Sequence, residues 1–355
     1  MTLRKTTRRE FLGTAARVAT GASLVSCFPD VGGRWAGELV ACTDDGSPAS
    51  FAPSARVVEI YDPLAVTTEP AIARDPDVIL RMWREALTTL TDDAADAWQT
   101  LLPDYVSGLR IGLKVNCLNA QCATSVELVR AVVQSLRDEL GIDPQSILVW
   151  DRRLDELARC GFTSEAVAGA QVVGTQLSTD NADGPGYEVD TCTVVDGKRA
   201  HLSRILTQMT DVTINCPVLK THGVSGVTAG MKNIYGVIDN PGDFHGDLVT
   251  ALPAIYALPP VQRSFRLTVV DALLAVTTGD TSSPMDTIAQ RLLVGRDPVA
   301  VDSYAVALVN TLRAEKNIGL SDVRADRTAW LDVAEELGLG SRAYELIAVD
   351  ASLPG

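Results

Sequence analysis

The amino-acid sequence predicts an α/β fold, namely a three-layer sandwich with a mostly parallel sheet and an inserted β-hairpin. Short apolar runs that suit buried strands alternate with amphipathic segments that carry helix-start signals. This alternation is typical of a parallel sheet covered by helices on both faces. Residues 187–203 depart from it, because two strand-like segments there flank Asp196-Gly197, a pair that favours a tight type I′ turn.

The individual elements follow from local patterns. Asp75-Pro76 and Asp297-Pro298 each combine a capping aspartate with a proline at the first helical position, and the capping box Thr124-Ser125-Val126-Glu127 opens a helix that runs to about Leu140. Further helices are expected at 92–102, after Asp151, at 247–258 and at 328–339. Strands are expected at 56–61, 109–116, 146–150, 171–175, 212–219, 265–271, 288–294 and 344–349.

The amino terminus carries an export pattern. Thr7-Arg8-Arg9-Glu10-Phe11-Leu12 matches a twin-arginine signal, and the weakly apolar segment after it is too polar and too short to cross a membrane. Leu24-Val25-Ser26-Cys27 resembles a lipobox, in which Cys27 would receive a lipid; ordinary signal cleavage nearby is the alternative. We therefore expect a signal at 1–27, a flexible tether at 28–54 and an α/β domain at 55–355, exported to the periplasm or cell surface by the twin-arginine machinery.

The charge of the mature chain excludes some partners. Residues 1–27 hold five basic residues and one acidic residue, so their removal changes the net charge from −14 to −18. So acidic a chain is not expected to bind nucleic acid, or to meet a membrane other than through a lipid on Cys27.

The cysteines do not indicate a metal cluster. No C-x-x-C pair is present among the seven cysteines, so no iron–sulfur cluster is expected. Cys117 and Cys122 are close enough to close a short disulfide loop in an exported protein, whereas Cys216 lies in an apolar run typical of core packing.

The stretch from Ile214 to Gly246 concentrates the rare basic residues. Two of the six lysines and two of the three histidines of the chain lie in it, while arginine supplies most other positive charge. Lys220, Thr221 and His222 are expected just beyond the carboxyl end of the 212–219 strand, where parallel sheets bind ligands. A glycine-rich surface loop with solvated charges is the alternative.

A second part of the site is expected at the 109–116 strand. Lys114 lies within an apolar run, where an unpaired ammonium group is unfavourable, so it either reaches the sheet edge or meets an anion. The helix that opens at Thr124 would direct free backbone N–H groups toward the end of this strand, which makes an anion site. A plain strand-to-helix connection needs no ligand.

Several of these segments together resemble one family. LKVN at 113–116, the T-S-V-E helix opening, PVLKTH at 217–222, TAGMKN at 228–233, His245, Asp271-Ala272 and GRDPVAVD at 295–302 resemble the domain-of-unknown-function 362 family over about residues 56–312. The resemblance implies the architecture rather than an activity. Some members carry a ferredoxin-like cluster segment, which this sequence lacks. The positions that match the pattern are Lys114, Asn116, Lys220, His222, Lys232, Asn233, His245, Asp297 and Asp302.

The first functional hypothesis is an enzyme that acts on a small carboxylate or phosphate. Lys220 and Lys232 would hold the anion, and His222 would transfer protons because its unperturbed pKa is near neutrality. Neighbouring ammonium groups lower one another's pKa, so one lysine could act as a base or nucleophile. The remaining candidate ligand-binding residues are Lys114, Asn116, Thr221, Asn233, His245 and Asp302.

Three alternatives use the same stretch. A non-catalytic cell-surface lipoprotein would bind an anionic ligand through the lysines alone. A metal-dependent enzyme would use His222 and His245 with Asp302 or Asp239. A structural loop would pair Lys220, Lys232 and the histidines with acidic residues, the candidates being Asp239, Asp243 and Asp247.

Overall fold

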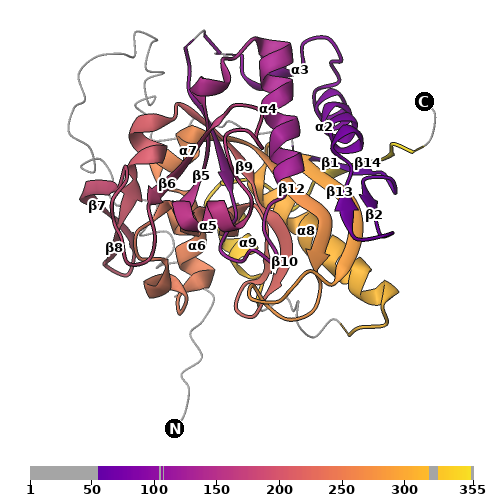
Figure 1. Ribbon diagram of the computed structural model, residues 1–355. Helices are drawn as coiled ribbons and strands as arrows, with labels where there is room; N and C mark the ends of the chain where they lie inside the picture. The colour runs from indigo at the N-terminus through magenta and orange to yellow at the C-terminus, as the bar shows by residue number, and fades with distance from the viewer. Residues whose placement is uncertain (1–54, 104, 107, 320–326, 353–355) are drawn as a thin grey trace.

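A central sheet organises the part of the chain that the computed structural model describes, residues 55–103, 105–106, 108–319 and 327–352 (Figure 1). The expected signal, Cys27 and the tether lie outside the described residues. The sheet runs in the order β14-β1-β13-β12-β9-β4-β5-β6, and β10 and β11 extend it beside β12. Its strands are β1 (Arg56–Tyr61), β4 (Ile111–Val115), β5 (Ile147–Arg153), β6 (Gln171–Gln176), β9 (Val212–Cys216), β10 (Val218–His222), β11 (Gly226–Thr228), β12 (Phe265–Val276), β13 (Thr287–Gly295) and β14 (Glu345–Asp350).

Most of the strand pairs along this order are parallel. β6, β5, β4, β9 and β12 pair in parallel, as do β1 and β14, whereas β13 runs antiparallel to both of its neighbours. The mostly parallel sheet that the sequence predicts is therefore confirmed.

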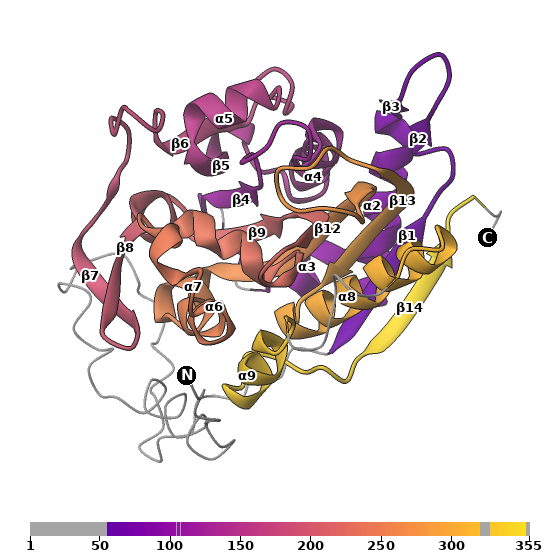
Figure 2. The same cartoon turned by 90° about the horizontal axis from the view of Figure 1, so that it is seen from below.

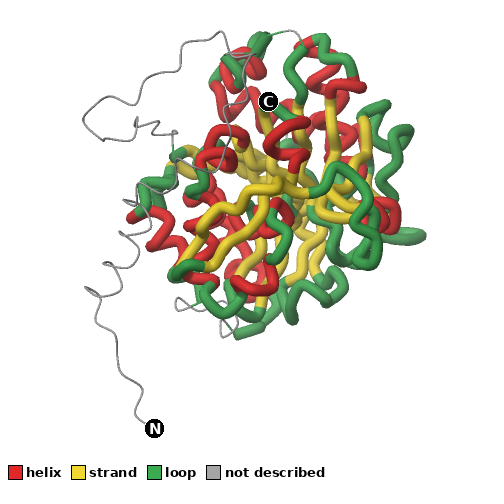
Figure 3. Tube along the Cα trace, turned by 90° about the vertical axis from the view of Figure 1, so that its left-hand side faces the viewer, coloured by secondary structure: helices red, strands yellow, loops and turns green. Residues whose placement is uncertain are grey.

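Helices cover both faces of the sheet (Figures 2 and 3). One hydrophobic core lies under α2 (Pro76–Thr91), α3 (Ala97–Leu101), α4 (Val126–Leu140) and α5 (Leu154–Arg159). A second core lies under α6 (Leu248–Tyr256), α7 (Pro259–Ser264), α8 (Pro298–Glu315) and α9 (Trp330–Glu336). Neighbouring residues of one strand enter different cores, as Leu148 and Val149 of β5 do, so the strands are buried on both faces. The three-layer α/β sandwich is confirmed.

The inserted hairpin is also present. β7 (Tyr187–Val195) and β8 (Lys198–Ser203) form a separate two-stranded sheet, and β2 (Val66–Thr67) pairs with β3 (Ala73–Arg74) in another. Asp196 and Gly197 have φ of 49° and 76°, the left-handed values that a type I′ turn requires.

Two of the predicted helix starts form as expected. The Asp75 carboxylate accepts the backbone N–H groups of Asp77 and Val78. The Asp297 carboxylate accepts those of Val299 and Ala300, which confirms its capping role.

Other predicted bounds were wrong for identifiable reasons. The helix expected at 92–102 is shorter and spans only α3. The residues before it form a turn instead, because the Asp93 carboxylate accepts the N–H groups of Ala95 and Asp96. The strand at 212–219 is two strands, since Pro217 has no N–H group to continue the ladder. β12 extends past Asp271 to Val276, with a register shift between Ala272 and Leu274.

Candidate functional site: a lysine–histidine cluster

The carboxyl ends of the central parallel strands bring most of the predicted site residues together. Lys114 lies on β4, Asn116 directly follows it, and Lys220 and His222 lie on β10, which continues the chain after β9. The 3-10 helix η4 (Met231–Val237) crosses this edge, and the shorter 3-10 helix η5 (Pro241–Phe244) leads into His245. We define the lysine–histidine cluster as Lys114, Asn116, Asp151, Lys220, His222, Lys232, Asn233, Tyr235 and His245.

Lys114 has a carboxylate partner that sequence reasoning did not assign. Its side chain is 1% exposed, and its Nζ lies 2.8 Å from Asp151 Oδ1 at the carboxyl end of β5. The other Asp151 oxygen accepts the Cys117 N–H at 2.7 Å. The Asp151 carboxylate supplies the counter-charge of Lys114 within the protein, and the ammonium also donates to the Val115 carbonyl. The available signal was that Asp151 ends the strand next to that of Lys114.

Two asparagines connect Lys114 to Lys220. Asn233 Nδ2 donates to the Lys114 carbonyl at 3.1 Å and to Asn215 Oδ1 at 2.9 Å. Asn233 Oδ1 accepts from Asn116 Nδ2 at 3.3 Å, and Asn116 Oδ1 accepts from Lys220 Nζ at 2.8 Å. These bonds fix both amide orientations, so Asn116 and Asn233 hold the two lysines in place.

Lys220 is a buried cation without a carboxylate partner among the described residues. Its side chain is fully buried, and its ammonium donates to Asn116 Oδ1 and, at 3.2 Å, to the Cys122 carbonyl. Burial lowers the pKa of Lys220. Neutral oxygens partly solvate this charge, but they do not cancel it.

Lys232 is the least constrained of the three lysines. It is 7% exposed, it makes no hydrogen bond or ion pair within the described chain, and its Nζ lies 3.3 Å from the centroid of the Tyr235 ring. Burial, with the charge of Lys220 as a smaller cause, lowers the pKa of Lys232 to about 7.

The ring contact of Lys232 opposes this lowering but does not cancel it. An ammonium over an aromatic face is stabilised by about 0.5–2 kcal/mol. A pKa lowered from 10.5 to about 7 corresponds to about 5 kcal/mol against the charged form. Burial is therefore the larger effect, and the pKa of Lys232 stays well below its ordinary value.

The two histidines have opposite tautomers. His222 Nδ1 accepts the backbone N–H groups of Val224 and Ser225, both at 3.0 Å, so the proton of the neutral ring is on Nε2. His245 Nδ1 lies 3.0 Å from the Pro241 carbonyl, which can only accept, so this nitrogen carries the proton and Nε2 keeps a lone pair. With respect to the described residues, the cluster thus contains one free imidazole donor and one free acceptor.

The histidine rings lie close to each other and to Tyr235. Their centroids are 6.0 Å apart in a stacked arrangement, and the Tyr235 ring meets His245 edge-on at 5.4 Å. Burial, followed by the charge of Lys232, lowers the pKa of His222 to about 4. The same two causes lower the pKa of His245. His222 is therefore neutral at physiological pH, unlike the near-neutral titration that its unperturbed pKa suggested.

Thr221 and Asp302 are engaged with the backbone. The Thr221 hydroxyl donates to the Gly279 carbonyl at 3.1 Å. The fully buried Asp302 carboxylate accepts the Gly230 and Met231 N–H groups at 2.6 and 2.8 Å, and burial raises the pKa of Asp302 to about 7. Asp302 therefore anchors the start of η4, the helix that carries Lys232 and Asn233.

At the start of α4, where the sequence predicts an anion site, a side-chain carboxylate of the protein takes the place of a ligand. The carboxylate of Asp271 on β12 accepts both the N–H and the hydroxyl of Ser125, at 2.7 and 2.6 Å. Ser125 is the cap residue but makes no capping bond, and the Thr124 hydroxyl donates to the Cys216 carbonyl. The predicted capping box was wrong, because Asp271 and Cys216 provide stronger or closer partners for its two hydroxyl groups.

Two alternatives can be compared with these contacts. The acidic residues proposed to pair with Lys220 and Lys232 have other partners: Asp239 contacts His201, Asp247 contacts Lys198, and Asp243 accepts from Asn240. The ion pairs expected for Lys220 and Lys232 are therefore wrong, whereas one histidine, His201, does pair with Asp239. Over the described ranges, no group of three or more His, Cys, Asp or Glu side chains is arranged to hold a metal. Cys117 and Cys122 are free thiols, so the disulfide that their spacing allowed is also absent.

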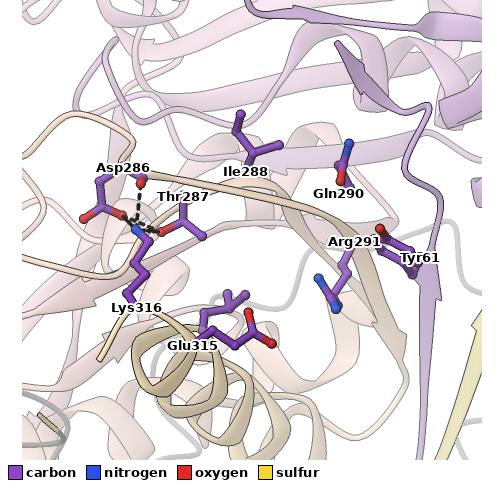
Figure 4. A pocket seen from close by; sticks show the side chains of 9 residues that line it. Tyr61, Asp286, Thr287, Ile288, Gln290, Arg291, Glu315 and Lys316 are labelled. Carbon is purple, nitrogen blue, oxygen red and sulfur yellow. Dashed lines mark hydrogen bonds and ion pairs between the residues drawn. The ribbon is translucent and has the colours of Figure 1, made fainter. Parts of the chain in front are cut away.

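A separate cavity lies farther along the sheet, beside β1 and β13 (Figure 4). It has a volume of about 480 Å³ and lies between β1, β13 and the end of α8. Lys316, which faces it, contacts Asp286 and Thr287. None of the predicted site residues lines this cavity, which is formed by Tyr61, Asp286, Thr287, Ile288, Gln290, Arg291, Leu312, Glu315 and Lys316.

No helix in the described part of the chain has the length and apolarity needed to span a membrane.

Comparisons with known proteins place the chain in a family without an assigned activity. No curated protein matches it. A crystal structure of a Thermotoga maritima protein from a structural genomics consortium aligns with a TM-score of 0.40 and 11% identity, over 67% of this chain and 60% of that one. The chain thus spans less than two thirds of that protein. The model of the family described as "Domain of unknown function (DUF362)" matches residues 111–307, more than half of the chain and all the cluster residues. The chain belongs to the DUF362 family.

Proposed function

We propose that this protein is an enzyme that acts on a small anionic substrate, a carboxylate or a phosphate, bound between Lys220 and Lys232. One observation carries the proposal: two neighbouring buried lysines have no carboxylate partner among the described residues, whereas Lys114 beside them has one. A buried charge without a counter-charge is unfavourable, and a second one nearby increases the penalty. A bound anion would relieve both, so the resting cluster favours anionic ligands.

The remaining cluster residues have distinct roles in this proposal. Lys114 is neutralised by Asp151, so it positions Asn233 and Asn116 instead of contacting the ligand. Asn116 directs the Lys220 ammonium. His222 would donate its Nε2–H to the substrate and His245 would accept a proton at Nε2, as their bonds to Val224, Ser225 and Pro241 imply. Lys232, with a pKa of about 7, would give or take a proton at neutral pH.

Export belongs to the same proposal but rests on the sequence alone. The twin-arginine pattern at Thr7 to Leu12 would bring a folded protein out of the cytoplasm, and Cys27 would attach it to a membrane if the lipobox is processed. The test is mass spectrometry of the mature amino terminus. A lipid-modified Cys27 as first residue supports the anchor, and an unmodified terminus contradicts it.

A thermal-shift screen of small carboxylates and phosphates tests the anion site. We expect ligands that stabilise the wild type to lose their effect in Lys220→Met and Lys232→Met. The matched control is Lys198→Met, because Lys198 lies on the hairpin and contacts Asp247 at the surface. Equal shifts in all four proteins would contradict the site.

Turnover separates the enzyme from a non-catalytic anion-binding lipoprotein. Ligands found by the screen are incubated with the wild type, His222→Gln and His245→Gln, and products are followed by NMR. His201→Gln, on β8 outside the cluster, is the control. Loss of turnover with retained binding in the cluster variants supports the enzyme. Binding without turnover in the wild type, unaffected by either substitution, supports the lipoprotein that only binds.

A further inference from the structure

The side-chain nitrogen of Lys232 is not held by hydrogen bonds within the described residues, unlike those of the buried Lys114 and Lys220. The Lys114 ammonium donates to Val115 and Asp151, and the Lys220 ammonium donates to Asn116 and Cys122. A nitrogen that is held as a charged donor has no lone pair to offer. Lys232 makes no such bond within the described residues and rests on the face of Tyr235.

The groups around Lys232 suit addition to a carbonyl. The Tyr235 ring contacts both Lys232 and His245, and the His245 ring stacks on that of His222. His222 therefore offers a neutral N–H donor and His245 a lone pair close to the same amine. A carbonyl oxygen needs such a donor, and an amine that attacks a carbonyl needs a base to take its proton.

We propose that Lys232 forms an imine with the carbonyl carbon of an anionic substrate whose carboxylate or phosphate binds Lys220. The inference rests on the proposed function and deepens it by naming the substrate class, namely molecules that carry an anionic group and an aldehyde or ketone. A 2-oxo acid and a phosphorylated aldehyde both meet this description. The fully buried Lys220 provides the fixed charge, and Lys232, which makes no hydrogen bond within the described residues, provides the nucleophile.

The reaction balances without a further reagent. The lone pair of Lys232 Nζ attacks the carbonyl carbon, and the C=O π electrons move to the oxygen, which accepts a hydrogen bond from His222 Nε2–H. His245 Nε2 takes a proton from the new ammonium nitrogen and returns it to the oxygen to form a hydroxyl group. A second proton transfer from nitrogen by the same route lets the hydroxyl leave as water while the C=N bond forms. The net change is an amine and a carbonyl giving an imine and water.

Reductive trapping with peptide mapping tests the inference on the full wild-type protein. Pyruvate or glyceraldehyde 3-phosphate is added at about pH 8 with sodium cyanoborohydride, and the modified lysines are located by mass spectrometry. A lysine with a pKa of about 7 is then unprotonated to an extent roughly 300-fold greater than one with the ordinary value of 10.5. We expect the adduct at Lys232 at least about tenfold in excess over the adduct at surface Lys198, since a weaker base is also a weaker nucleophile.

Matched reagents and variants identify the anionic anchor. Acetone and propionaldehyde, which carry no charge, should label Lys232 much less than the anionic carbonyls do. Lys220→Met should reduce labelling at Lys232 by the anionic reagents and leave labelling at Lys198 unchanged. The comparison of pyruvate with glyceraldehyde 3-phosphate shows whether carboxylate or phosphate is preferred.

The two proposals fail in different ways. If small anions still stabilise the protein through Lys220 but neither carbonyl labels Lys232 above Lys198, the imine is overturned and the anion site stands. If anions do not bind at all, the proposed function fails. If neutral and anionic carbonyls label Lys232 equally, the reactivity of its amine is supported, but the proposed anionic substrate class is overturned.

Discussion

Affinity for a small anion without a carbonyl carbon to attack, such as sulfate, is expected to fall as the pH rises above 7, because such an anion would lie between Lys220 and Lys232 and bind the charged form of Lys232. The free protein has a Lys232 pKa of about 7, and an anion beside the ammonium raises that pKa in the complex. Below pH 7 the lysine is already protonated, so binding takes up little or no proton there. Above pH 7 each binding event must protonate Lys232, so the apparent affinity weakens.

The size of this effect follows from the pKa. For one group with a pKa of about 7 in the free protein, the apparent dissociation constant rises about 11-fold at pH 8 and about 100-fold at pH 9 relative to its low-pH limit. The rise ends once the pH passes the higher pKa of the complex. The ligand should be sulfate or oxalate, because neither changes its charge in this range.

Isothermal titration calorimetry at pH 6, 7, 8 and 9 measures both the affinity and the proton uptake. In two buffers of different ionisation enthalpy, we expect uptake of about half a proton at pH 7 and about 0.9 at pH 8. Lys232→Met should bind more weakly and show no such dependence. Wild-type affinity that agrees within twofold between pH 6 and pH 9 would refute the assignment of Lys232 as the titrating anion ligand.

Three stability measurements by urea unfolding test the cluster itself. Asp151→Asn leaves the buried Lys114 ammonium without its counter-charge and should destabilise by about 3–5 kcal/mol; a loss below about 1 kcal/mol would mean that the pair is not buried as described. Lys232→Met should stabilise the ligand-free protein at pH 7 by up to about 5 kcal/mol, because it removes a lysine whose charged form is disfavoured in the folded state. Between pH 7 and 10.5 the unfolded wild type binds more protons than the folded one, so wild-type stability rises with pH in that window. A variant less stable than the wild type at pH 7 would contradict this sign. Gly236→Ala would place its Cβ 2.7 Å from Lys114 Nζ and should destabilise, by about 1–3 kcal/mol, whereas Gly223→Ala, whose Cβ has nothing within 4 Å, serves as the matched control. Equal effects of the two alanines would show that η4 does not approach Lys114 closely.

The fold was largely predictable because its signals are local. Asp75-Pro76 and Asp297-Pro298 began helices as expected, since a cap and a proline act within one turn. Asp196-Gly197 formed the expected hairpin for the same reason. Pro217 was the exception, because a long apolar run concealed the break that separates β9 from β10.

The grouping of the candidate residues was predictable by residue type, but their individual partners were not. The concentration of lysines and histidines at 214–246 indicated which side chains come together, and the carboxyl ends of parallel strands indicated where. The Lys114–Asp151 pair and the Ser125–Asp271 contact join residues 37 and 146 positions apart, which no local pattern specifies. The low pKa of His222 likewise depends on burial beside Lys232, which only the folded arrangement determines.

The most direct test of the anion site is to locate a heavy anion in a crystal. Crystals of the wild type soaked in selenate, measured at the selenium absorption edge, give the anion position independently of any assay. We expect one anomalous peak within hydrogen-bonding distance of both Lys220 Nζ and Lys232 Nζ, and no peak there in crystals of Lys220→Met. Selenate bound only at surface arginines, with the two lysines of the wild type unoccupied, would contradict the central claim.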